Sequence, residues 1–283
     1  MPLALKRITV PRVVREYWEE SRAPRYSLLF ALPLLLLYEG LAAVLDAGQP
    51  NGIRNGADVM LRQIFVAVSG RYAPIVFGVT VLGLSIWFVT RDLKRTRAPL
   101  EGGVFATMFA ESLTFALLFG TVVGTVTAHL IHPHLATAWP LGRWSLAHAG
   151  LTPPRMLPTH AATSRAALGM IGRQSTATRV MLSLGAGLYE ELLFRVILVS
   201  AFAVSFRVLF GWRTWVAGMA AAVAAATIFA AFHYVGPYGD PFRLDSFVFR
   251  LLGGLAFSAL YLTRGFGITA WTHALYDLSV LLG

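Results

Sequence analysis

The chain has 283 residues, of which 56% are hydrophobic and only 13% are charged, and it carries a formal net charge of +10. A water-soluble domain of this size could hardly enclose so much apolar surface in one core, so the composition indicates a membrane protein. The chain contains no cysteine, which excludes disulfides, thiolate metal sites and a cysteine nucleophile.

A membrane-spanning helix needs about 20 mostly apolar residues, and several stretches meet that length. The clearest of these stretches are residues 27–45, 73–90, 104–131, 177–206, 215–234, 247–263 and 266–282. We therefore predict an all-α, polytopic integral membrane protein with about seven transmembrane helices and an active site buried among the last four. The shorter apolar segment 59–69 is interrupted by Arg62, and we predict that it is interfacial or re-entrant.

The basic residues lie in short connections between apolar runs, which is typical of topology signals and not of a nucleic-acid-binding surface. They gather before the first predicted span and after the second, fourth and sixth. By the positive-inside rule these ends are cytoplasmic. We therefore expect a protein of the inner or plasma membrane with its N-terminus in the cytoplasm, whose partners are lipids and a membrane-associated substrate but no nucleic acid.

The order of the apolar runs predicts four segments. Residues 1–26 form a basic cytoplasmic N-terminal segment, and residues 27–131 contain three transmembrane helices. A long connection over 132–176, rich in Pro, Ala, Thr and Arg, separates them from the four helices of 177–283. We interpret the connection as an internal boundary.

Ionisable residues inside membrane spans are costly, so they mark functional candidates. The fourth predicted span contains Glu190, Glu191 and Arg195. On a helix Glu191 and Arg195 are four residues apart and able to pair, whereas Glu190 points about 100° away. One carboxylate is then neutralised within its own helix, and the other is free to act as a general base for water.

The later spans add two histidines and another carboxylate. His233 ends the fifth predicted span, and the seventh contains His273 and Asp277 on one helical face. A carboxylate at this spacing can fix the tautomer of the imidazole. Burying such a set on three spans indicates a reaction or a conducted ion. Glu39 and Glu111 also lie in apolar runs, where they would line a water path or pair with a loop arginine.

The motifs Glu-Glu-x-x-x-Arg, Phe-x-x-x-His and His-x-x-x-Asp follow one another on successive predicted helices. In this order they resemble the CAAX protease and bacteriocin-processing family, the Abi or CAAX prenyl protease type, which includes the Ras-converting-enzyme type of prenyl protease. The resemblance covers about residues 177–282. Several members carry asparagine where this chain has Asp277.

The resemblance implies an intramembrane endopeptidase that cleaves a membrane-associated protein or peptide, possibly near its C-terminus. Glu190 and His233 would activate the attacking water, while His273 and Asp277 would bind the oxyanion of the tetrahedral intermediate. Glu191 and Arg195 would hold their helix in register. This division fits general chemistry, because the nucleophile needs a base within reach and the oxyanion needs donors already aimed at it.

The family is often named as metalloproteases, and Glu190, His233 and His273 would be the ligands of a zinc ion if one is bound. The chain contains no His-Glu-x-x-His motif, and a glutamate–histidine pair can activate water directly. We therefore favour chemistry without a metal and leave zinc as the alternative cofactor.

Two other classes of function use the same buried residues. A proton- or cation-coupled transporter would employ them as a relay, although no repeat symmetry or pair of broken spans is evident. A non-catalytic membrane scaffold or immunity factor would keep the fold without turnover, because a motif alone does not establish catalysis.

Overall fold

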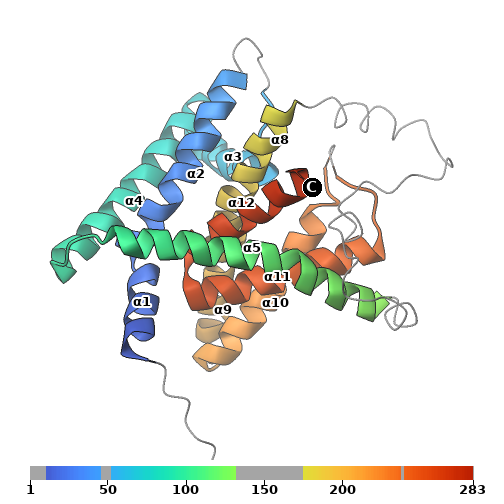
Figure 1. The fold of residues 1–283 in the computed structure, drawn as a ribbon. Helices are drawn as coiled ribbons and strands as arrows, with labels where there is room; N and C mark the ends of the chain where they lie inside the picture. The colour runs from blue at the N-terminus through green and yellow to red at the C-terminus, as the bar shows by residue number, and fades with distance from the viewer. Residues whose placement is uncertain (1–10, 46–51, 132–174, 237–238, 283) are drawn as a thin grey trace, which may run out of the picture.

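The fold is that of an all-α polytopic membrane protein, as predicted. A computed structural model describes residues 11–45, 52–131, 175–236 and 239–282, and within these ranges it contains helices and no strand. The elements are α1 (Arg12–Arg22), α2 (Pro24–Leu45), α3 (Gly56–Ser69), η1 (Gly70–Tyr72), α4 (Ala73–Thr96), α5 (Gly102–Ile131), α8 (Thr176–Gly185), η3 (Ala186–Glu190), η4 (Leu192–Val199), α9 (Ser200–Phe210), α10 (Thr214–Phe232), α11 (Leu244–Arg264) and α12 (Phe266–Leu282). Figure 1 shows these helices crossing one another at varied angles.

Six stretches of the described chain are long and apolar enough to cross a membrane. They are Pro24–Leu45, Gly56–Thr96, Gly102–Ile131, Thr176–Phe210, Thr214–Phe232 and Leu244–Arg264. The seventh predicted span corresponds to α12, whose 17 residues give a helix of about 26 Å, slightly shorter than the apolar core of a bilayer. The greater part of the predicted connection, residues 132–174, lies outside the described residues.

The short apolar segment interrupted by Arg62 forms a separate helix, α3. Its 14 residues begin after Asn55, which caps the helix by accepting a hydrogen bond from Ala57 N–H at 2.8 Å. Gly70, with φ of 55°, ends it before α4 begins. Because α3 packs against both α4 and η3, it brings its N-terminal end to the helix that carries the two adjacent glutamates.

That helix runs from Thr176 to Phe210 and is not α-helical throughout. It is π-helical over η3 and η4, on either side of Glu191. The wider π turn is rare and is frequent at functional sites. Ser175 caps the first turn, and Gly211, with φ of 65°, ends the helix. We call this stretch, residues 176–210, the central helix.

The main core lies between α2, α3, the central helix and α12. Its buried members include Leu34, Tyr38, Leu61, Leu188, Phe194 and Ala274. The C-terminal helix α12 packs against α2, α5, α8, η3 and α11, and Figure 1 shows it in the middle of the bundle. The predicted site residues on the central helix and on α12 therefore face an interior built by both halves of the chain.

Two glycines allow α12 to approach its neighbours closely. A Cβ on Gly187 would lie 2.5 Å from Ala270 O and 2.7 Å from Ala274 N. A Cβ on Gly267 would lie 2.5 Å from Ser27 O. In both places the obstacle is backbone, so only glycine permits this spacing of the helices.

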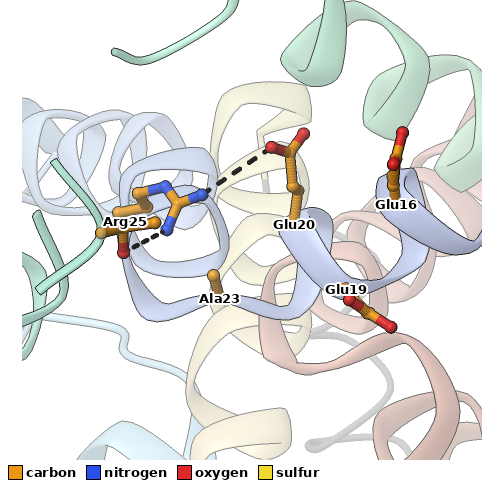
Figure 2. A pocket seen from close by; sticks show the side chains of 6 residues that line it. Glu16, Glu19, Glu20, Ala23 and Arg25 are labelled. Atoms are coloured by element: carbon orange, nitrogen blue, oxygen red, sulfur yellow. Dashed lines mark hydrogen bonds and ion pairs between the residues drawn. The ribbon is translucent and has the colours of Figure 1, made fainter. Parts of the chain in front are cut away.

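Charged side chains join the N-terminal helices at the turn between α1 and α2. Buried Arg25 pairs with Asp92 at 3.2 Å, donates to Thr96 Oγ1 at 2.9 Å and lies 3.9 Å from Glu20. Figure 2 shows this arginine beside a pocket of about 310 Å³ whose lining includes Glu16, Glu19 and Glu20. None of the predicted site residues lines this pocket.

Glu111 pairs with an arginine, one of the two roles considered for it. Arg264 Nε and Nη2 donate to its two carboxylate oxygens at 2.6 and 2.7 Å, and Arg264 also donates to Ser21. Tyr17 donates to the same carboxylate; burial and this hydrogen bond raise the pKa of Tyr17, so it remains a donor at neutral pH. The cluster joins α1, α5 and α11.

We predict that Gly187→Ala destabilises the protein by roughly 1–3 kcal/mol, because the added methyl group overlaps the backbone of α12. Thermal unfolding in detergent measures the change. Gly218→Ala is the matched control, since nothing lies within 4 Å of a Cβ at that position in α10. An unchanged melting midpoint in Gly187→Ala would show that α12 is not packed so closely.

We predict that Glu111→Gln destabilises the fold by about 2 kcal/mol, because Arg264 loses a charged, two-point partner. The melting midpoint in detergent is again the measurement. Arg12→Ala serves as the control, since it removes an exposed ion pair with Glu16 within one helix and should leave the midpoint unchanged. Equal effects of the two substitutions would contradict a structural role for Glu111.

Candidate active site

The two adjacent glutamates of the central helix are both buried but face different neighbours. The exposed fraction of Glu190 is 8%, and that of Glu191 is 0%. They lie at the junction of η3 and η4. Burial of two carboxylates side by side is costly unless each finds a partner, so their partners define what each can do.

Glu191 is the centre of a buried ion cluster. Its Oε1 lies 3.1 Å from Arg195 Nη1, as the spacing of four residues predicted. The same oxygen accepts a hydrogen bond at 2.7 Å from Nδ1 of His273. The Nε2 atom of His273 lies 3.7 Å from Asp277 Oδ2, which is beyond hydrogen-bond distance. The imidazole therefore donates its hydrogen bond to Glu191, while Asp277 lies on the same face of α12, as predicted, within ion-pair distance.

Aromatic rings enclose this cluster. The Arg195 guanidinium lies over the ring of Phe229, 4.5 Å from its centre, and 5.4 Å from that of Phe257. The His273 ring stacks on Phe257 with centres 4.5 Å apart. Cations are attracted to ring faces, most strongly where water is excluded. The rings of α10 and α11 therefore pack against the guanidinium and the imidazole, and Glu191 lies between these two groups.

No cation in the described part of the chain is bonded to Glu190, which instead accepts a hydrogen bond from Asn55 Nδ2 to its Oε1 at 3.0 Å. Within the described residues, Asn55 is the one hydrogen-bond partner of this side chain. The carboxylate also interacts electrostatically with His233 and His273. Its other carboxylate oxygen accepts no hydrogen bond from the described residues, whereas Oε1 of Glu191 faces both Arg195 and His273.

His233 follows the last residue of α10 and is half-buried. Its Nδ1 lies 2.8 Å from the carbonyl oxygen of Phe229. A carbonyl only accepts, so Nδ1 carries the proton, and in the neutral ring Nε2 is an acceptor. The Phe229 ring meets the imidazole edge to face, with centres 4.9 Å apart. The tautomer is thus fixed by the backbone of its own helix.

The structure places the six sequence-predicted residues in two groups. Glu191, Arg195, His273 and Asp277 form the ion cluster between the central helix and α12. Glu190 and His233 lie beside it without a hydrogen bond between them among the residues that the structure describes. Ion pairs within 4.0 Å therefore join four of the six, and electrostatic interaction with Glu190 joins the two groups.

Sequence reasoning did not identify Asn55, which lies 135 residues before Glu190. The one available signal was its position as a helix cap ahead of a half-length apolar segment. Non-helical backbone at membrane depth is tolerated only where protein buries it or water reaches it. A polar cap at such a place has a partner inside the protein.

A second polar network lies next to Asn55. Tyr38 accepts from Asn55 N–H at 3.1 Å and donates to buried Asp58 at 2.9 Å. Glu39 pairs with the loop residue Arg54 at 2.8 Å, one of the two roles considered for it, and with Arg62 at 2.7 Å. It also accepts from Tyr189 on the central helix.

The residues considered for zinc do not form a ligand set. No group of three or more His, Asp or Glu side chains with metal-holding geometry occurs in the part of the chain that the structure describes. His273 directs one ring nitrogen at Glu191 and the other toward Asp277. Since Glu190, His233 and His273 do not form such a group, we derive no catalytic step through a metal.

Comparison with protein-family models matches residues 172–279 to the family described as "Type II CAAX prenyl endopeptidase Rce1-like". No curated protein and no solved structure matches the chain significantly. The matched segment contains all six sequence-predicted residues and excludes Asn55. It agrees with the resemblance that the motifs indicated. Residues 172–279 of this chain are therefore similar to the Rce1-like family of type II CAAX prenyl endopeptidases.

Proposed function

We propose that this protein is an intramembrane endopeptidase in which Glu190 and His233 activate water and His273 stabilises the oxyanion. The observation that carries the proposal is the different environment of the two adjacent glutamates. Glu191 pairs with a guanidinium and accepts a hydrogen bond from an imidazole, whereas Glu190 has one hydrogen-bond partner among the described residues, the neutral side chain of Asn55. A buried carboxylate without a bonded cation is suited to take a proton and return it.

The first step uses the free acceptors of Glu190 and His233. A water molecule between them gives a proton to the carboxylate as its oxygen attacks the scissile carbonyl carbon. The fixed tautomer of His233 presents Nε2 as an acceptor for the second proton of that water. When the carbon–nitrogen bond breaks, the proton held by Glu190 passes to the leaving amine, so the carboxylate is regenerated.

The oxyanion of the tetrahedral intermediate needs a donor already in place. His273 donates through Nδ1 to Glu191, and a protonated ring would also donate through Nε2. Two acidic neighbours, Glu191 and Asp277, favour that cationic ring electrostatically. Counting Arg195, the cluster then carries two positive and two negative charges, which makes a cationic donor tolerable inside the membrane.

We propose a membrane-associated protein or peptide as substrate, cleaved near its C-terminus. The family is described as acting on CAAX prenyl proteins, which makes a prenylated C-terminus the first substrate class to test. The basic connections support a cytoplasmic N-terminus, since Arg91, Lys94, Arg95 and Arg97 surround the C-terminal end of α4.

We predict that Glu190→Gln abolishes cleavage while the protein still folds. Matched cells that express the wild type or the variant are compared by mass spectrometry of membrane-protein termini. New termini should appear only with the wild type and should identify the substrate. Glu19→Gln, which removes an exposed carboxylate on α1, should produce the same termini as the wild type. Termini that persist in Glu190→Gln would refute the proposed base.

We predict that Glu191→Gln lowers both stability and turnover, because it leaves Arg195 without its counter-ion and His273 without an anionic acceptor. Removing one partner of a buried pair costs roughly 3–5 kcal/mol. The double variant Glu191→Gln, Arg195→Met should regain most of the lost melting temperature and remain inactive. Recovery of activity along with stability would assign the cluster a purely structural role.

A further inference from the structure

Asn55 fills a position that the family match does not include. It precedes α3 in the N-terminal half of the chain, outside the matched residues 172–279. Its exposed fraction is 7%, and its side chain reaches the Glu190 carboxylate at 3.0 Å. A buried amide next to the proposed base has a direct influence on how that base is presented.

The orientation of the Asn55 amide is settled by its two side-chain partners. Its Oδ1 accepts from Ala57 N–H at 2.8 Å, and its Nδ2 donates to Glu190 Oε1. Turning the amide over would set an oxygen against a carboxylate and an NH₂ group against an N–H, so both bonds would be lost. The helix cap therefore dictates that the NH₂ group faces Glu190.

The position of Asn55 is fixed in turn by the surrounding network. Its backbone N–H donates to Tyr38, which donates to Asp58, and Asp58 pairs with Arg62. A Cβ on Gly185 would lie 2.4 Å from the Tyr38 ring and 3.0 Å from Asn55 Cβ. The loop before α3 is thus pressed directly against the central helix, five residues before Glu190.

We propose that Asn55 is a positioning residue for Glu190, supplied to the active site by the N-terminal half of the chain. It holds Oε1 by one neutral hydrogen bond and leaves the other carboxylate oxygen for the attacking water. A neutral donor fixes the geometry without the full neutralisation that an arginine gives Glu191. The inference rests on the proposed function, because it assigns a role relative to the proposed base.

The matched variants are Asn55→Ser and Asn55→Asp. Both residues cap a helix about as well as asparagine. Serine is too short to reach Glu190, and aspartate sets a carboxylate against it. We expect kcat to fall at least about 10-fold in Asn55→Ser and further in Asn55→Asp, with KM unchanged, because Asn55 positions the base and does not hold substrate. The assay uses purified protein and a peptide spanning the cleavage site found by the comparison of termini.

Ser175→Ala is the control for the loss of a helix cap. Ser175 caps the central helix itself by accepting from Thr178 N–H at 3.1 Å, far along the sequence from Glu190. This variant should keep the wild-type kcat. If Asn55→Ser and Asn55→Asp also turn over at the wild-type rate while Glu190→Gln is inactive, the positioning role is refuted and the proposed function stands.

A stability measurement tests the contact without relying on activity. Asn55→Asp should lower the melting midpoint, and adding Glu190→Gln should restore it, because a glutamine NH₂ group can donate to the new carboxylate. Restoration supports the contact even if Glu190→Gln proves active and the proposed function fails. Additive effects of the two substitutions would show that residues 55 and 190 do not interact, which overturns the inference.

Discussion

The structure depends on one constraint, which is that a charge buried in a membrane protein must be matched where it lies. Glu191 satisfies it by facing groups on two helices. One of its oxygens, Oε1, faces Arg195 on its own helix and His273 on α12, and the rings of Phe229 and Phe257 cover the guanidinium and the imidazole. Arg195 and His273 both face Glu191, and among the described residues no cation is bonded to the adjacent Glu190.

The same constraint explains the polar residues of the N-terminal half. Asp58 and Glu39 are matched by Arg54 and Arg62, and two tyrosines complete the set. One of these tyrosines, Tyr189, directly precedes Glu190 on the central helix. The network therefore ties α2 and α3 to the helix that carries the proposed base. The N-terminal spans contribute to the site's geometry and do not serve only to surround it.

Local spacing accounts for what the sequence predicted well. The apolar run of 266–282 coincides with α12, and the spacing of four residues predicted the Glu191–Arg195 pair. Local spacing also placed Asp277 on the same face as His273, 3.7 Å from it, but it did not predict that Glu191, 82 residues away, accepts the hydrogen bond of the imidazole. Helical periodicity cannot rank a neighbour on the same helix against one on another helix.

The π-helical turns and the role of Asn55 could not be predicted from the sequence, for a related reason. The sequence around Glu190 is typical of an ordinary apolar helix. The wider turn occurs where Gly187 packs against the backbone of α12, which is a tertiary contact. Asn55 is a polar residue in a short connection. Its importance depends on its hydrogen bond to Glu190, which is distant in the sequence.

Two neighbouring carboxylates on one helix thus acquire different tasks. One is paired with Arg195 on its own helix and with His273 on α12, and the other accepts a hydrogen bond from a neutral amide of the N-terminal half. Bonding a cation to Glu190 as well would hold it firmly but would oppose its taking a proton, whereas leaving it without any partner would bury an unsatisfied charge. A single neutral donor is the arrangement that avoids both, and in this fold the loop before α3 is the element that supplies it.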